Sequence, residues 1–265
     1  MPAVSPPEQC HYIAENSRAN ILVVEDRDQL SKIKQIRHRL PDLKAIVMMK
    51  GAVDEEGVHS WDQISMIARE ISEDELDARI QAQTPDDCCT LIYTSGTTGN
   101  PKGVMISHDN ITWTSSRLLE TIGDSPDDVI ASYLPLSHIA EQIISLHCPI
   151  AMGATTWFAE NLDRLGDNLL EIRPTVFVGV PRVWEKIQSK IMTIDETNSW
   201  FKRKITAWAR KIGLAAGYAR QDGKAMPPFY PLSDRLVFSK VKQNLGLNRF
   251  RLFVATAAPT SQETL

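Results

Sequence analysis

The residues best suited to chemistry in this 265-residue sequence lie in one short segment, from Tyr93 to Val104. The segment reads Tyr-Thr-Ser-Gly-Thr-Thr-Gly-Asn-Pro-Lys-Gly-Val. Glycine allows backbone N–H groups to approach a polyanion without an intervening Cβ. The hydroxyl groups can donate to phosphate oxygens or coordinate a metal ion, and the lysine supplies a positive charge for a phosphate. The segment therefore predicts a loop that binds phosphate groups.

A segment rich in glycine and hydroxyl side chains can also form a Walker A loop or a hairpin turn without a ligand. A Walker A loop needs Gly immediately before its Lys and Ser or Thr immediately after it, whereas Pro101 precedes Lys102 and Gly103 follows it. The residues after the loop also have the pattern of a strand and not of a helix, so a Walker A loop is excluded. A hairpin turn rich in serine and glycine, without a ligand, is the remaining alternative.

Strands and helices are expected to alternate on both sides of the segment. Before it, the sequence predicts helices over 8–19, 28–40 and 72–83, strands over 20–24, 43–49 and 88–93, and a polar turn over 51–59. The helix over 72–83 is expected to be solvated and the strand over 88–93 to be buried. After the segment, the sequence predicts strands over 104–106, 129–134, 154–158, 175–178 and 251–255, with helices capped by Ser107 or Asp109, starting at Ser137, over 161–172 and starting at Pro181. This alternation is typical of a mostly parallel sheet covered by helices, so an α/β fold is expected.

Composition excludes several classes of protein. Hydrophobic residues make up 43% of the chain and charged residues 23%, which excludes wholesale disorder. The formal net charge is -4, so a nucleic-acid partner is not expected. The most apolar long stretch, 139–159, is interrupted by polar side chains, and no transmembrane helix is expected.

The cysteines and the N-terminus indicate a compartment. The four cysteines lack the spacing of a zinc site and favour a reducing environment. The first seven residues have neither the basic nor the apolar region of a signal peptide. A cytoplasmic location is expected.

Residues 200–212 combine an apolar stripe with basic side chains. Phe201, Ile205, Trp208 and Ile212 share one helical stripe, and five Lys or Arg residues accompany them. Such a helix can pack on its own domain while the basic stems cover the rim. It can also lie at a membrane surface. Both interpretations stay open, the second as peripheral contact with intracellular membranes such as the endoplasmic reticulum.

The Tyr93–Val104 segment resembles the phosphate-binding signature of the adenylate-forming superfamily, residue for residue. Residues 133–141, 179–186 and 253–259 resemble later motifs of its long-chain acyl-CoA synthetases. Taken together with residues 60–62 and 107–113, these segments most resemble the bubblegum-type long-chain acyl-CoA synthetases. The resemblance extends over the chain from about Glu8 onward.

The resemblance implies part of the large N-terminal domain of the adenylate-forming fold, with mostly parallel sheets covered by helices. Residues 1–7 would be a non-homologous or disordered start. Residues 8–265 would be a partial AMP-binding domain, in which 195–248 form a mostly helical insert.

The resemblance also implies an activity and a set of site residues. Such enzymes join a long-chain fatty acid to ATP and then pass the acyl group to coenzyme A, releasing AMP and pyrophosphate. The ATP phosphates would contact Thr94, Ser95, Gly96, Thr97, Thr98, Gly99, Asn100, Pro101 and Lys102. Thr94 would also be a ligand of Mg²⁺, and the adenine would lie beside Ala257, Ala258 and Pro259.

Four further side chains are interpreted through the same resemblance. His138 would lie near the channel for the acyl group and coenzyme A, with a packing histidine as the alternative. Glu141 would either orient His138 or be exposed. Arg182 and Trp184 are expected to be structural, as a helix-start ion pair and a packing anchor.

Several parts of the family's catalytic machinery have no counterpart in the sequence. Its later magnesium-binding glutamate, ribose-binding aspartate, hinge and C-terminal lysine are expected to lie beyond Leu265, with the C-terminal lid. The chain is therefore expected to be incomplete for catalysis. One alternative is an inactive truncated product that binds nucleotide or modulates the full-length synthetase. The other, a short-chain or aryl-acid ligase, is disfavoured by the helical residues 195–248.

Overall fold

The computed structural model describes residues 5–94, 99–196 and 198–256, which fall into two compact units. The first unit comprises residues 1–116 and 135–143, and the second comprises 117–134 and 144–265. Each unit has its own parallel sheet, and each is described by itself below. The expected α/β fold is confirmed.

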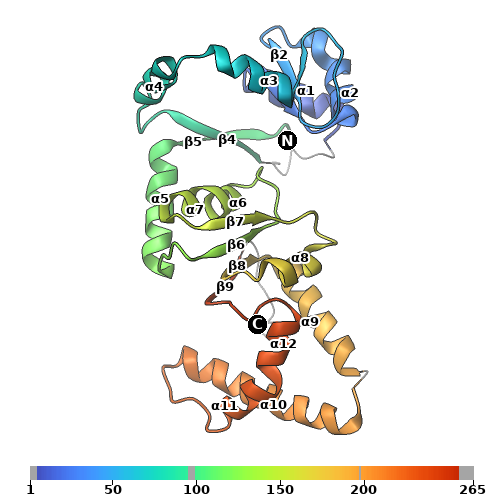
Figure 1. Ribbon diagram of the computed structural model, residues 1–265, viewed down its shortest axis with the longest axis vertical. Coiled ribbons are helices and arrows are strands. Elements are labelled where there is room, and N and C mark those ends of the chain that lie inside the picture. Colours follow the sequence, from blue (N-terminus) through green and yellow to red (C-terminus); the bar gives the residue numbers. More distant parts are fainter. Residues whose placement is uncertain (1–4, 95–98, 197, 257–265) are drawn as a thin grey trace. The chain divides into compact units, whose positions relative to one another are not determined.

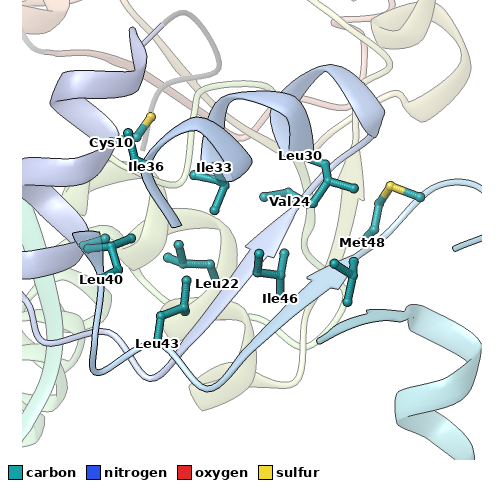
Figure 2. Packing of buried hydrophobic residues seen from close by; sticks show 12 residues of the cluster. Cys10, Leu22, Val24, Leu30, Ile33, Ile36, Leu40, Leu43, Ile46 and Met48 are labelled. Atoms are coloured by element: carbon teal, nitrogen blue, oxygen red, sulfur yellow. The ribbon is translucent and has the colours of Figure 1, made fainter. Parts of the chain in front are cut away.

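The first unit begins with a three-stranded parallel sheet in the order β1-β2-β3. Its strands are β1 (Ile21–Val24), β2 (Ala45–Met48) and β3 (Val58–Ser60), and the helices beside them are α1 (Pro7–Asn16) and α2 (Arg27–Ile36). A 3₁₀ turn, Arg37–Arg39, ends the second helix. Asp26 caps α2 by accepting a hydrogen bond from the Gln29 backbone N–H. The apolar sides of α2 and the sheet enclose a core that includes Leu22, Leu30, Ile33, Ile36, Ile46 and Met48 (Figure 2).

Two solvated helices follow this sheet: α3 (Trp61–Ile67) and α4 (Glu73–Gln81), with a 3₁₀ turn, Ala68–Glu70, between them. Ser60 and Gln63 form a reciprocal capping box at the start of α3, and Ser72 caps α4. The solvated helix over 72–83 is thus confirmed. The prediction of a polar turn over 51–59 is partly wrong, because β3 begins at Val58.

An antiparallel hairpin, β4 (Cys88–Thr94) and β5 (Lys102–Ser107), continues the first unit and leads into α5 (His108–Ile122). Ser107 is the cap: its hydroxyl accepts from the Asn110 N–H, and the Asn110 side-chain oxygen accepts from the Ser107 N–H, both at 3.2 Å. The expected strand over 88–93 is confirmed, but the expectation that it is buried is wrong. Only Ile92 of β4 is buried, because a two-stranded hairpin leaves much of each strand at the surface.

The second unit contains a four-stranded parallel sheet in the order β7-β6-β8-β9 (Figure 1). Its strands are β6 (Val129–Ser132), β7 (Thr155–Phe158), β8 (Val176–Gly179) and β9 (Leu252–Ala255). The helices of this part are α7 (Cys148–Met152), α8 (Leu165–Ile172) and α9 (Pro181–Glu196). Phe177 of β8 has no exposed surface and stacks on Tyr133 and Phe250.

One arginine joins three segments of the second unit. Arg251, just before β9, donates from Nε to both Asp128 carboxylate oxygens at 2.9 and 3.1 Å, and from Nη2 to the same carboxylate. It also donates to the backbone carbonyls of Ile122 and Gly123 at the end of α5. Thr175 donates to Asp128 at 2.7 Å. The start of β9 is therefore fixed against the starts of β6 and β8.

The expected helical segment after α9 is confirmed. It consists of α10 (Trp200–Gln221), α11 (Tyr230–Ser233), the π-helical turn Asp234–Phe238 and α12 (Ser239–Asn244) (Figure 1). A Cβ on Gly213 of α10 would lie 2.8 Å from the Phe238 ring, so the small residue permits close packing. Among the described residues, no helix is long and apolar enough to span a bilayer.

Candidate nucleotide-binding site

The expected phosphate loop connects the two strands of the β4–β5 hairpin. Thr94 pairs with Lys102 across the hairpin, and Tyr93 pairs with Gly103. Gly99 has a φ of +98°, a conformation that glycine adopts without the cost that a side chain would impose. Ser95, Gly96, Thr97 and Thr98 lie outside the described residues. The antiparallel register thus brings the two ends of the loop together.

The ring of Tyr93 lies over Gly103. A Cβ added at Gly103 would be 3.0 Å from the ring, which is tighter than ordinary van der Waals contact. The Tyr93 hydroxyl donates to the Asn16 side-chain oxygen at 2.8 Å, which ties the hairpin to the end of α1. Burial raises the pKa of this phenol. Gly103 therefore has a packing role at the base of the loop.

Thr94 and Lys102 are both exposed, and their types suit a polyphosphate. Among the described side chains, no carboxylate forms an ion pair with Lys102, so its ammonium group is available for a phosphate. The described part of the chain also holds no cluster of three or more His, Cys, Asp or Glu that could bind a metal. A Mg²⁺ ion is commonly held by few protein oxygens together with substrate phosphates and waters. The Thr94 hydroxyl fits such a site as a single protein ligand.

In the second unit, the place where a ligand would be expected is the edge of the sheet at which the parallel strands have their carboxyl ends. The chain passes from β6 to β7 on one side and then to β8 on the other, so the order of connection reverses beside β6. Ligands of open α/β sheets bind outside the carboxyl ends at such a switch point. The Tyr133 hydroxyl lies there: it donates to the Val178 carbonyl at 3.0 Å and accepts from the Val180 N–H at 3.2 Å.

Gly179 ends β8 and lies under the indole of Trp184. A Cβ at Gly179 would be 2.5 Å from that ring, and the indole N–H donates to the Gly179 carbonyl at 3.0 Å. Trp184 also packs edge-on against Phe177. The expectation that Trp184 is a packing anchor is confirmed.

The next strand, β9, runs parallel to β8, and the Thr256 N–H donates to the Gly179 carbonyl at 3.2 Å. Thr256 therefore lies beside the end of β8. The three residues expected beside the adenine, Ala257, Ala258 and Pro259, lie outside the described residues.

His138 is exposed and immediately precedes the short helix α6 (Ile139–Gln142) in the first unit. Its backbone carbonyl accepts from the Glu141 and Gln142 N–H groups at 3.1 and 3.3 Å. Because its side chain is exposed, the alternative of a buried packing histidine is not supported. Glu141 is buried, so the alternative that it is exposed is wrong.

Parallel sheets with helices beside them define the class of protein in structural terms: an α/β fold. The family model described as "AMP-binding enzyme" matches residues 2–265, and the chain belongs to this family.

Three similar proteins refine this assignment. The chain is 43% identical over 268 residues to the long-chain-fatty-acid–CoA ligase ACSBG2 of Xenopus laevis, covering 97% of this chain and 36% of the relative. It is 42% identical over 270 residues to ACSBG1 of Bos taurus, covering 98% and 37%. The anthranilate CoA ligase AuaEII, solved with anthranoyl-AMP, matches 69% of this chain and 35% of its own at 27% identity and a TM-score of 0.60. The chain thus spans little more than a third of the length of each of these proteins.

Proposed function

We propose that this chain is part of an enzyme that activates long-chain fatty acids, converting ATP, fatty acid and coenzyme A into acyl-CoA, AMP and pyrophosphate. The observation that carries the proposal is the cross-strand pairing of Thr94 with Lys102 at the two ends of the expected phosphate loop. No carboxylate among the described side chains forms an ion pair with Lys102. The names of the relatives, which are long-chain-fatty-acid–CoA ligases, support the same substrate class.

In the first step, a fatty carboxylate attacks the α-phosphorus of ATP and pyrophosphate leaves. The protein's part in such a reaction is mainly to position the reactants and to stabilise negative charge. We assign residues 94–102 to the phosphates, with Lys102 as the cation. Thr94 would hold Mg²⁺, which neutralises the polyphosphate when it is bound. Ala257, Ala258 and Pro259 are assigned to the adenine side.

His138 is assigned to the channel for the acyl group and coenzyme A. The support is its exposed position before α6, where its side chain is accessible to a substrate. Residues 8–265 are assigned to the AMP-binding domain of the enzyme. A cytoplasmic location, with peripheral contact between residues 200–212 and intracellular membranes such as the endoplasmic reticulum, completes the proposal.

Binding of a fluorescent ATP analogue in the presence of Mg²⁺ tests the nucleotide site on the chain as it stands. Saturable binding that unlabelled ATP reverses is expected, and Lys102→Ala should weaken it. Lys44→Ala, which removes an exposed lysine outside the hairpin, is the matched control. Absence of binding, or equal binding by both variants, contradicts the assignment. ATP–pyrophosphate exchange with palmitate then tests the activity itself.

A further inference from the structure

The two sides of α10 have different chemistry. Ala209 and Ala216 are buried, and Ile205, Trp208 and Ile212 are half-buried, on the side that packs against other helical residues. Trp208 contacts Phe229 in an edge arrangement there. The apolar stripe expected from the sequence is thus mainly the packing side, and only Phe201, at its start, is largely exposed.

The opposite side of α10 is exposed and has a regular pattern, which we call the outward face. Trp200, Ala207 and Leu214 follow one another at intervals of seven residues, and Tyr218 comes one turn later. Residues seven apart on a helix differ by only about 20° in direction, so these side chains form one ridge. Trp200 is 69% exposed and Tyr218 is 56% exposed.

Cations flank this ridge on both sides. Arg203 and Arg210 lie along one edge and Lys204 and Lys211 along the other, again seven residues apart, and all four are exposed. The Lys204 ammonium lies 4.1 Å from the centre of the Trp200 ring. The outward face is therefore a narrow apolar ridge between two rows of positive charge.

The charge of α10 is unbalanced. The helix contains six basic residues and no acidic residue, whereas the whole chain has a net charge of -4. Within the described part of the chain, no ion pair involves any of the four flanking cations. The charge is complementary to an anionic surface outside the chain.

We propose that the outward face of α10 binds the anionic surface of a lipid bilayer, with the ridge entering the headgroup region and the four cations contacting lipid phosphates and carboxylates. Tryptophan and tyrosine favour the membrane–water interface, where the ring is in contact with acyl chains and its polar group with water. Lysine and arginine beside them keep their charged ends at the headgroups. A second copy of the chain would bring six like charges against six, and the absence of acidic residues from α10 argues against such self-pairing.

This inference rests on the proposed function in one respect. A fatty acid partitions into bilayers, so an enzyme that uses it has access to more substrate when it lies on a bilayer surface. Helix α10 and the nucleotide loop are different segments of the chain, and they belong to different units. The test of this inference therefore needs neither ATP nor fatty acid.

The experiment measures co-sedimentation of the intact chain with vesicles. Binding is expected to vesicles of phosphatidylcholine with phosphatidylserine and to be much weaker with phosphatidylcholine alone. Arg210→Gln/Lys211→Gln, which removes one cation from each edge, should weaken binding about 25-fold, since each cation near an anionic surface contributes about fivefold. Glutamine keeps the helix propensity nearly unchanged.

The matched control is Lys44→Gln/Arg69→Gln, which removes one Lys and one Arg from exposed positions outside α10. It should bind as the unmodified chain does. Circular dichroism verifies that both variants stay folded. Equal binding to both vesicle types, or equal loss in both variants, overturns the proposal. A dimer that only the α10 variant abolishes, without vesicle binding by either form, would identify self-association instead.

Failure of this proposal and failure of the proposed function give different results. Loss of vesicle binding with intact ATP binding contradicts only the lipid assignment. Vesicle binding without ATP binding contradicts only the nucleotide site.

Discussion

Thr94 and Lys102 are register partners across the β4–β5 hairpin, so a hydroxyl group and an ammonium group stand at the two ends of one loop. Their spacing is set by backbone pairing of the strands, and not by the loop between them. A ligand that binds the loop therefore meets a cation that the hairpin has already positioned.

Replacing Lys102 by Ala is expected to weaken binding of Mg-ATP about 10- to 100-fold, because a charge-assisted contact to a phosphate is lost. Lys102 is exposed and β5 keeps its backbone pairing, so the melting temperature should not change. Titration with a fluorescent ATP analogue and thermal unfolding measure the two quantities. A large fall in melting temperature would show that the lysine has a structural role.

Gly103→Ala should destabilise the hairpin by about 1–2 kcal/mol, because the new methyl group would be 3.0 Å from the Tyr93 ring and the ring would have to move. Urea unfolding at neutral pH gives the free energy. Gly217→Ala is the control: it lies in α10, and its Cβ would meet nothing within 4 Å. That variant should be neutral or slightly more stable, since Ala favours a helix over Gly. Equal destabilisation in both would contradict the packing explanation.

Asp128→Asn is expected to cost about 2–3 kcal/mol at neutral pH, because it leaves Arg251 without its buried carboxylate. The hydrogen bond from Arg251 lowers the pKa of Asp128 in the folded state. The contribution is therefore fully present above the ordinary Asp pKa of about 3.9 and is lost as the pH falls through the lower folded value.

Urea unfolding of both proteins at a series of pH values checks this sign. The difference in unfolding free energy between wild type and Asp128→Asn should be constant from about pH 7 to 5 and should shrink below about pH 4. A difference that grows as the pH falls would be incompatible with an ionised Asp128.

Gly246→Ala should be strongly destabilising, by about 3 kcal/mol or more. The residue has a φ of +73°, and its Cβ would be 2.0 Å from the Leu169 carbonyl oxygen, where backbone cannot yield easily. Gly223 has a φ of +64° but open space around it. Gly223→Ala should therefore cost only about 1 kcal/mol, the strain of the left-handed conformation. Similar unfolding energies for the two variants would mean that packing at Gly246 contributes little.

The positions of many strands and helices in this fold can be predicted from the local pattern of apolar and turn-forming residues. Short apolar runs bounded by turn residues predict the four strands described in the second unit, and Pro181 correctly marks the start of α9. The three-residue strand Val58–Ser60 was missed, because three residues are too few to show an alternation. For the segment 88–93, the apolar residues predicted a strand correctly but could not show that its partner would be a single hairpin strand.

The residues of the candidate site are harder to predict from local sequence pattern than the strands and helices are. The phosphate loop is contiguous, so its residues are recognisable in order. Tyr133 received no role from the sequence, because its hydroxyl meets Val178 and Val180, about 45 positions later in the chain. For α10, residue spacing identified an amphipathic helix, but which side faces its neighbours depends on contacts with residues such as Phe229 and Phe238.

The contact between Arg251 and Asp128 joins residues 123 positions apart. During synthesis on the ribosome, it can therefore form only after Arg251 has been added to the chain. Strands β6, β7 and β8 emerge early, while β9 follows only after the long helical segment. Until then β8 is an open edge, whose unpaired backbone groups are a template for pairing with other chains. Nascent chains of this protein should therefore need most chaperone protection between synthesis of residue 179 and synthesis of residue 255.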